Sequence, residues 1–327
     1  MASFFNTLDI ILMPRKLTDY FLLFLKGLAM GSADVIPGVS GGTIAFITGI
    51  YEELLDTIKA FDLTALKLLT GFKIKELWKH INGNFLVTLL AGIGLSIIIF
   101  AQVITHLLEL YPIYVWSFFF GLIIISSITI ARQIKRWSPG VIFAFIAGLV
   151  SAYIIVSSTP ATTPTSWWFI ILSGMVAITA MILPGISGSF ILLIMGKYEY
   201  VLRALKELNY LVIALFAAGC VIGLLSFSRA ISWFLKKYHN MAIGLLSGFM
   251  VGSLYKIWPW KRVAQFRLNS AGEQVPFIEN NVWPHYYQKL TGQDPQILFA
   301  LLFIALGFGV VVIIEKIAHT TVKYKNK

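Results

Sequence analysis

Two short stretches of the sequence combine proline, glycine and hydroxyl side chains within otherwise apolar surroundings. The first reads PGVSGGT (37–43) and the second reads PGISGS (184–189). Proline ends a helix, glycine permits a turn, and the serine that follows can cap a new helix. The start of that helix offers unpaired N–H donors and the positive end of the helix dipole, which together bind phosphate or carboxylate groups. Each stretch therefore predicts an anion-binding site.

We expect the small and hydroxyl-bearing residues of both stretches to contact the anion. The candidate donors are Ser40, Gly41, Gly42, Thr43, Ser187, Gly188 and Ser189. The residues expected to break the helices are Pro37, Gly38, Pro184 and Gly185. Glycines in a membrane helix can also serve only to let helices pack closely. Two copies that both carry proline and hydroxyl groups favour a site over packing alone.

One carboxylate, Asp34, lies where the helix before the first stretch should end. Exposed carbonyls make a helix C-terminus unfavourable for a bare carboxylate, and placement at membrane depth costs roughly 2.5–3.5 kcal/mol. Protonation, a bound cation or a basic partner would relieve this, and Lys26, two turns earlier, is the nearest basic candidate. Lys26 could instead contact a phosphate. A plainer interpretation has Lys26 reaching the membrane surface while Asp34 faces a water-filled vestibule.

A tyrosine–glutamate pair follows each stretch, Tyr51–Glu52 in the first copy and Tyr198–Glu199 in the second. Such a pair is typical of an interfacial anchor beside a solvated acid, and the alternative is a gate or ion site. No metal site is expected because the five histidines are scattered, and the single cysteine, Cys220, excludes a disulfide within the chain. The only cofactor we expect is a coupling proton or sodium ion.

The surroundings of these residues are strongly apolar. Of the 327 residues, 58% are hydrophobic and 13% are charged, and the mean hydropathy is +0.82. A soluble domain carries about 25% charged residues, so this chain has too little polar surface to coat a water-soluble particle. The composition predicts a membrane protein that crosses the bilayer several times. It excludes soluble enzymes and nucleic-acid-binding proteins, and the net charge of +11 is first a topology signal.

Apolar segments long enough to cross a bilayer, which takes roughly 20 helical residues, occur at six places. They are 85–108, 113–131, 141–157, 210–228, 240–257 and 297–315. Two further apolar stretches, 18–58 and 168–205, contain the polar breaks. Irregular backbone at membrane depth must be buried in protein or line a polar cavity. Each of these two stretches is therefore expected to form a re-entrant hairpin or a pair of broken helices.

The two broken stretches are copies of one another. An offset of 147 residues aligns them, and 11 of the 23 positions in 37–59 are then identical to those in 184–206. The chain is expected to divide into repeat 1 (17–157) and repeat 2 (168–315). An interfacial segment (1–16) precedes them, a tail (316–327) follows them, and a polar loop (258–296) interrupts the second repeat.

Three full crossings in each repeat would make the second repeat face the opposite way. With a cytoplasmic N-terminus, 17 basic residues fall inside and 8 outside, as the positive-inside rule favours. We therefore expect an all-α membrane protein of two inverted repeats, with both termini in the cytoplasm. Rocking of one repeat against the other would open a midplane site to either side in turn, and the small-residue faces would permit a homodimer.

With GSADVIPGVSGGTIAFITGIYEEL and ILPGISGSFILLIMGKYE in view, the chain resembles the PopT family of prokaryotic polyprenyl-phosphate transporters over nearly its whole length. The resemblance implies a flippase that carries undecaprenyl phosphate across the cytoplasmic membrane, so that this lipid carrier of wall and surface-glycan assembly is recycled. It implies a lipid and a membrane as partners, and no nucleic acid.

Two other functions compete with this one. Membrane-embedded undecaprenyl-diphosphate phosphatases have inverted repeats and a similar PG-x-S-R-S loop, but Gly41 and Gly188 stand where their arginine would be. Without that cation a diphosphate is hard to clamp, so we do not expect an enzyme. The second alternative is a transporter of a small soluble anion, or a cation/proton antiporter that uses Asp34.

Overall fold

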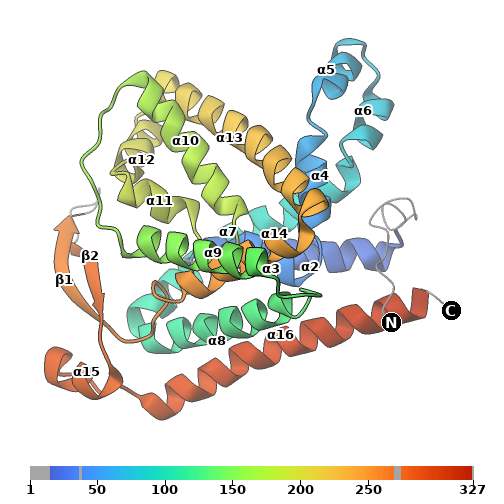
Figure 1. The fold of residues 1–327 in the computed structure, drawn as a ribbon. Coiled ribbons are helices and arrows are strands. Elements are labelled where there is room, and N and C mark those ends of the chain that lie inside the picture. Colours follow the sequence, from blue (N-terminus) through green and yellow to red (C-terminus); the bar gives the residue numbers. More distant parts are fainter. Residues whose placement is uncertain (1–14, 37–38, 269–273, 326–327) are drawn as a thin grey trace.

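The protein was analysed as a computed structural model, which describes residues 15–36, 39–268 and 274–325 (Figure 1). The predicted helix breakers Pro37 and Gly38 lie outside the described residues. So does nearly all of the predicted interfacial segment, of which only Arg15 and Lys16 are described.

The described chain is mainly helical and contains one two-stranded sheet. The elements of its first half are α2 (Leu17–Asp34), α3 (Gly41–Ile47), α4 (Tyr51–Lys59), α5 (Leu63–Thr70), α6 (Ile74–His80), α7 (Gly83–Leu110), α8 (Pro112–Ala131) and α9 (Pro139–Ser157). Those of its second half are α10 (Trp167–Ile182), α11 (Gly188–Ile194), α12 (Tyr198–Lys206), α13 (Tyr210–Lys237), α14 (His239–Ser253), β1 (Lys261–Leu268), β2 (Gln274–Asn281), α15 (Pro284–Thr291) and α16 (Ile297–Lys325).

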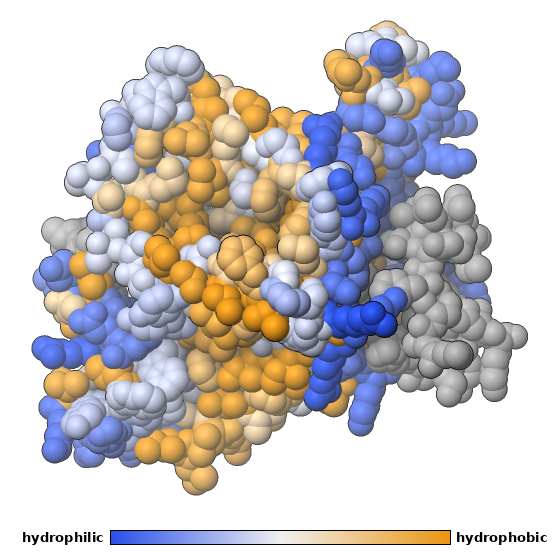
Figure 2. Space-filling view, in the orientation of Figure 1, coloured by the Kyte–Doolittle hydropathy of each residue, from blue (hydrophilic) through white to orange (hydrophobic). Residues whose placement is uncertain are grey.

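Five of the described helices, α7, α8, α9, α13 and α16, are long and apolar enough to cross a membrane. Figure 2 shows apolar residues over the middle of the molecule and hydrophilic residues gathered toward two opposite ends, as a bilayer requires. The prediction of an α-helical, multi-pass membrane protein is confirmed. Helix α13 continues to Lys237, beyond the apolar segment at 210–228, because apolar length measures only the hydrocarbon crossing and not the whole helix.

Both broken stretches are interrupted where the proline–glycine motifs occur. Helix α2 ends at Asp34 and α3 begins at Gly41, while α10 ends at Ile182 and α11 begins at Gly188. The turn in the second copy uses Gly185, whose φ of +91° lies in the region that glycine adopts without strain. Each stretch thus supplies one short helix that starts inside the molecule.

Glycines let the long helices pack in close pairs. Helix α2 packs on α7 and α10 packs on α13, each pair within one half of the chain. The other two pairs join the halves, because α8 packs on α16 and α9 packs on α14. A Cβ at Gly148 or Gly248 would collide with the backbone of the facing helix. Close backbone approach through small residues is the usual way in which helices associate in lipid.

The loop predicted at 258–296, which the structure describes except for residues 269–273, carries the only strands of the described residues. Strands β1 and β2 pair antiparallel, with Lys261 opposite Asn281 and Leu268 opposite Gln274. Trp260 ties the loop to the start of α16 through its Nε1–H, which donates to the Pro295 carbonyl at 2.8 Å. The expectation of purely helical structure needs this one local correction.

Candidate functional site

The start of α3 meets the end of α10 and the turn that precedes α11. The Ser40 hydroxyl donates to the Met181 carbonyl at 2.9 Å, and the Gly185 N–H donates to Thr43 Oγ1 at 2.9 Å. Gly42 lies so close to α10 that an added Cβ would stand 2.5 Å from the Ile182 carbonyl oxygen. Residues of the two copies, far apart in sequence, are therefore in direct contact.

The N-terminus of α3 is capped by two of the predicted residues. Ser40 has extended backbone angles (φ −128°, ψ 137°), and its Oγ accepts from the Gly42 N–H at 3.0 Å. Asp34 Oδ1 accepts from the Gly41 N–H at 2.7 Å. Charge-assisted bonds from a carboxylate to a helix N-terminus are among the stronger hydrogen bonds in proteins. The protein's own carboxylate thus occupies the position where an anionic ligand would bind α3.

Asp34 is the last residue of α2, as predicted, but its carboxylate does not remain among the carbonyls at that helix end. The chain reverses between α2 and α3, and that reversal brings the carboxylate to the donor end of the next helix instead.

The pairing of Lys26 with Asp34 was also wrong. Lys26 Nζ donates to the Thr48 carbonyl at 2.8 Å, and Thr48 is the C-cap of α3. An ammonium group there satisfies a free carbonyl and the negative end of the helix dipole. Because α3 has seven residues and a helix rises about 1.5 Å per residue, Lys26 lies at the far end of α3 from the anion-binding candidates. The structure does not bring Lys26 together with them.

The second copy has a different arrangement at its helix start. Ser187 is the N-cap of α11 but makes no side-chain cap, and its Oγ lies 2.7 Å from the Oγ of Ser189. Gly188 packs on α10, where an added Cβ would lie 2.6 Å from the Ala177 carbonyl oxygen. Met181 of the second copy is aligned with Asp34 of the first copy. The two helix starts are therefore chemically unequal, and only the first holds a carboxylate.

Burial shows that this site is closed in the structure. Ser40 and Thr43 are fully buried and Ser187 is 4% exposed. The glycines at 41, 42, 185 and 188 and Pro184 are buried as well, and Ser189 is half-buried. Access for a ligand requires the start of α3 to separate from the end of α10.

The tyrosine–glutamate pairs begin α4 and α12 and lie away from the helix starts. Tyr51 is a core residue and not a surface anchor, since it is 3% exposed and its ring lies 4.8 Å from that of Phe46. Glu52, Tyr198 and Glu199 are half-buried.

The neighbouring acid, Glu53, links segments that are distant in sequence. Its carboxylate forms an ion pair with Arg15 and accepts from Asn82 Nδ2 at 2.8 Å. These bonds tie α4 to two other places in the chain, the residues just before α2 and the N-cap of α7. Sequence reasoning missed Glu53 because nothing local identifies its two partners.

A buried charge cluster on the β-strands was also missed. One oxygen of Glu279 lies 3.5 Å from the ammonium groups of both Lys256 and Lys261. Lys261 is 7% exposed at its side chain, and its ammonium group lies 3.6 Å from the centre of the Trp116 ring in α8. Burial lowers the pKa of Lys261 from 10.5 to about 7. Lys256 lies over Phe190 of α11, so the cluster joins the β-strands to the second short helix.

An apolar pocket opens beside this cluster. Its volume is about 490 Å³, and it is lined by aromatic and aliphatic side chains that include Tyr153, Tyr255, Trp258 and Trp283. Aromatic side chains with polar tips suit the border between lipid and water. The pocket has the character of a surface for a hydrocarbon chain.

Comparison with known proteins gives one family and two relatives. The family model described as undecaprenyl phosphate translocase-like matches residues 30–275. A polyprenyl-phosphate transporter of Vibrio cholerae serotype O1 is 46% identical, over 94% of this chain and 100% of the relative. A polyprenyl-phosphate transporter of Staphylococcus aureus is 32% identical, over 72% of this chain and 85% of the relative. No solved structure matches the chain.

Proposed function

The chain belongs to the undecaprenyl phosphate translocase-like family, and from that membership we propose that it transports a polyprenyl phosphate such as undecaprenyl phosphate across the membrane. The match to the Vibrio relative covers that protein completely. Both relatives are named as transporters and not as enzymes. The five apolar helices provide the membrane-spanning body that such transport needs.

The observation that carries the mechanism is the contact of the start of α3 with the end of α10 and the turn before α11. A phosphate headgroup loses its hydration at the middle of a bilayer, and buried polar groups are costly unless hydrogen bonds replace that water. The N–H groups at Gly41, Gly42 and Gly188 and the hydroxyls nearby form a preorganised set of donors. The prenyl chain can remain in lipid while only the headgroup passes this set.

Asp34 gives the mechanism a competitive step. Its carboxylate holds the Gly41 N–H, and a phosphate that takes this donor must displace it, since two anions at one helix start repel each other. The displaced Asp34 then takes up a proton or a sodium ion. Transport is thereby coupled to an ion gradient, and without substrate the carboxylate keeps the site closed.

For orientation, we propose that both termini face the cytoplasm of a prokaryotic cell and that the chain lies in the cytoplasmic membrane. The helix pairs support an inverted duplication, because α2 with α7 corresponds to α10 with α13. In the two halves α8 corresponds to α14, and α9 corresponds to α16. The pair α8 with α16 in one half-to-half contact therefore corresponds to the pair α14 with α9 in the other. The short helices α3 and α11 and their neighbours then move against the four helices of these two pairs, α8, α9, α14 and α16.

The test is translocation of a labelled polyprenyl phosphate in vesicles that contain the purified protein. We expect Ser40→Ala to slow translocation, because the serine both caps α3 and bonds to the Met181 carbonyl. Ser226→Ala is the matched control, since Ser226 bonds only to carbonyls of its own helix. Equal rates in vesicles with and without protein would refute the proposed function.

A further inference from the structure

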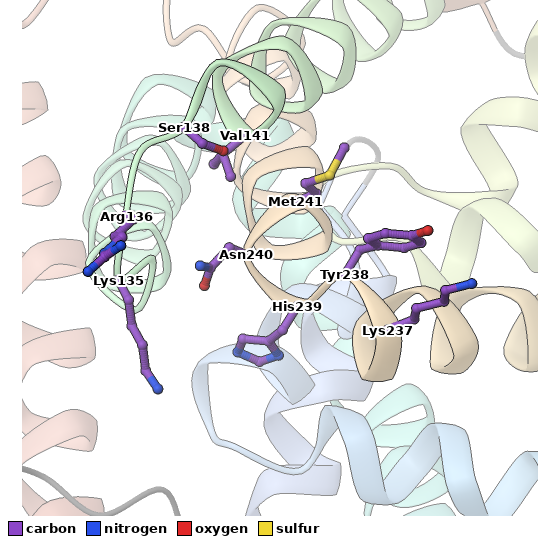
Figure 3. A pocket seen from close by; sticks show the side chains of 9 residues that line it. All are labelled: Lys135, Arg136, Ser138, Val141, Lys237, Tyr238, His239, Asn240 and Met241. Carbon is purple, nitrogen blue, oxygen red and sulfur yellow. The ribbon is translucent and has the colours of Figure 1, made fainter.

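A second pocket, lined by basic and polar side chains, lies at the end of the bundle where α9 and α14 begin (Figure 3). The residues of α3 and α11 do not line it. Its volume is about 550 Å³. One wall is the connection between α8 and α9, with Lys135, Arg136 and Ser138, and the other is the junction of α13 and α14, with His239 and Asn240. Each half of the chain therefore supplies one wall.

The charge of this pocket is entirely positive. Lys135, Arg136 and Lys237 line it together with His239, and none of its described lining residues is acidic. Lys135, His239 and Asn240 point into the gap between the two walls (Figure 3). Lys237 extends away and lies over the rings of Trp233 and Tyr238. A concave surface lined by one sign of charge concentrates ligands of the opposite sign.

The helices that end at the pocket add to this positive potential. Helices α9 and α14 run parallel, because Gly244 packs on Val141 and Gly248, four residues later, packs on Phe145. Both N-termini therefore lie at the same end, where Ser138 is the N-cap of α9 and His239 is the first residue of α14. The positive dipole ends of the two helices reinforce the side-chain cations.

We propose that this pocket binds a phosphate monoester, as a site separate from the two short-helix starts. Lys135 supplies charge from within the gap, Arg136 adds charge at its rim, and the Asn240 amide supplies a neutral donor. The planar guanidinium group of arginine suits the oxygens of a phosphate. The phosphate comes either from the headgroup of a polyprenyl phosphate or from free phosphate. The lipid source rests on the proposed function, whereas the pocket's chemistry does not.

The experiment reads out the pocket locally, in full-length protein purified in detergent. Ser138→Cys in a Cys220→Ser background places one thiol on the wall, and its rate of modification by a maleimide is measured. Inorganic phosphate and farnesyl phosphate are the two probes, and farnesol is the uncharged comparison. Ser157→Cys, at the other end of α9, is the matched thiol control.

We expect both phosphates, or farnesyl phosphate alone, to slow modification at position 138 and not at position 157. Protection by both indicates a general phosphate site, and protection by farnesyl phosphate alone indicates the lipid headgroup. Lys135→Gln with Arg136→Gln should weaken either probe by about tenfold or more, since charge-assisted bonds are lost. Lys206→Gln with Lys289→Gln removes the same charge from exposed positions elsewhere and should change nothing.

The pocket proposal is overturned if neither phosphate protects position 138, or if farnesol protects it equally well. It is also overturned if the distant charge pair weakens protection as much as the pocket pair. Translocation measured on the same preparations separates the two proposals. Protection without translocation contradicts only the proposed function, and translocation without protection contradicts only the pocket.

Discussion

Gly42→Ala tests the contact between the start of α3 and the end of α10 most directly. The added Cβ would lie 2.5 Å from the Ile182 carbonyl oxygen, and ordinary contacts of this kind begin near 3.4 Å. The obstacle is backbone at the end of α10, so no side chain can rotate away. The two helices must therefore separate by about 1 Å, and overpacking of this kind costs about 1–3 kcal/mol.

Gly94→Ala is the matched control for this substitution. Gly94 lies within α7, and an added Cβ there meets nothing within 4 Å. Alanine in a helix interior is favoured over glycine by roughly 0.5–1 kcal/mol. The same chemical change is thus expected to destabilise the protein at one glycine and to stabilise it slightly at the other.

Two measurements apply to both variants: thermal unfolding in detergent, and translocation of labelled polyprenyl phosphate in vesicles. We expect Gly42→Ala to lower the unfolding midpoint and to slow translocation, because the closed arrangement of donors no longer forms. Gly94→Ala should unfold at the wild-type temperature or above it, with unchanged translocation. If the two variants behave alike in both assays, the described contact between the copies is wrong.

Three further predictions concern charged groups. Asp34→Asn keeps an oxygen for the Gly41 N–H but removes the titratable group. Translocation should therefore lose its dependence on a proton or sodium gradient. If the dependence remains, a group other than Asp34 couples transport to the gradient. Lys261 has a pKa of about 7 when folded and 10.5 as its ordinary value. Between these values the unfolded chain binds more protons, so stability should fall as pH falls from 10.5 to 7, by up to about 1.4 kcal/mol per pH unit. Unfolding at several pH values should show this slope in the wild type and not in Lys261→Met, and an equal slope in both would remove Lys261 as its source. Lys26→Met should destabilise the protein by about 1–3 kcal/mol, because the bond to the Thr48 carbonyl is lost. The control Lys16→Met changes an exposed position and should leave stability unchanged. Equal unfolding midpoints of the two variants would contradict the role of Lys26.

The features predicted correctly from sequence are those set by local composition. Long apolar runs determine α7, α8 and α9, and the motif around Pro184 determines where α10 stops. A helix break at a proline–glycine pair depends on backbone sterics of a few residues. No distant partner is needed to predict it.

The features that sequence reasoning missed depend on contacts between distant segments. Asp34 bonds to Gly41 only because the chain reverses between two helices. Lys261 was counted only as one of the eight basic residues outside the membrane, but it is buried against Trp116, far away in sequence. Periodicity and composition describe single segments, and they carry no information on which side chains meet across the fold.

The pairing of α8 with α16 and of α9 with α14 bears on how such a chain originated. An ancestral polypeptide of half this length would have left the glycine-lined faces of two helices bare. Two copies of such a polypeptide would cover these faces for each other. Joined in one chain, the two halves need not stay identical, and they carry Asp34 in one and Met181 in the other.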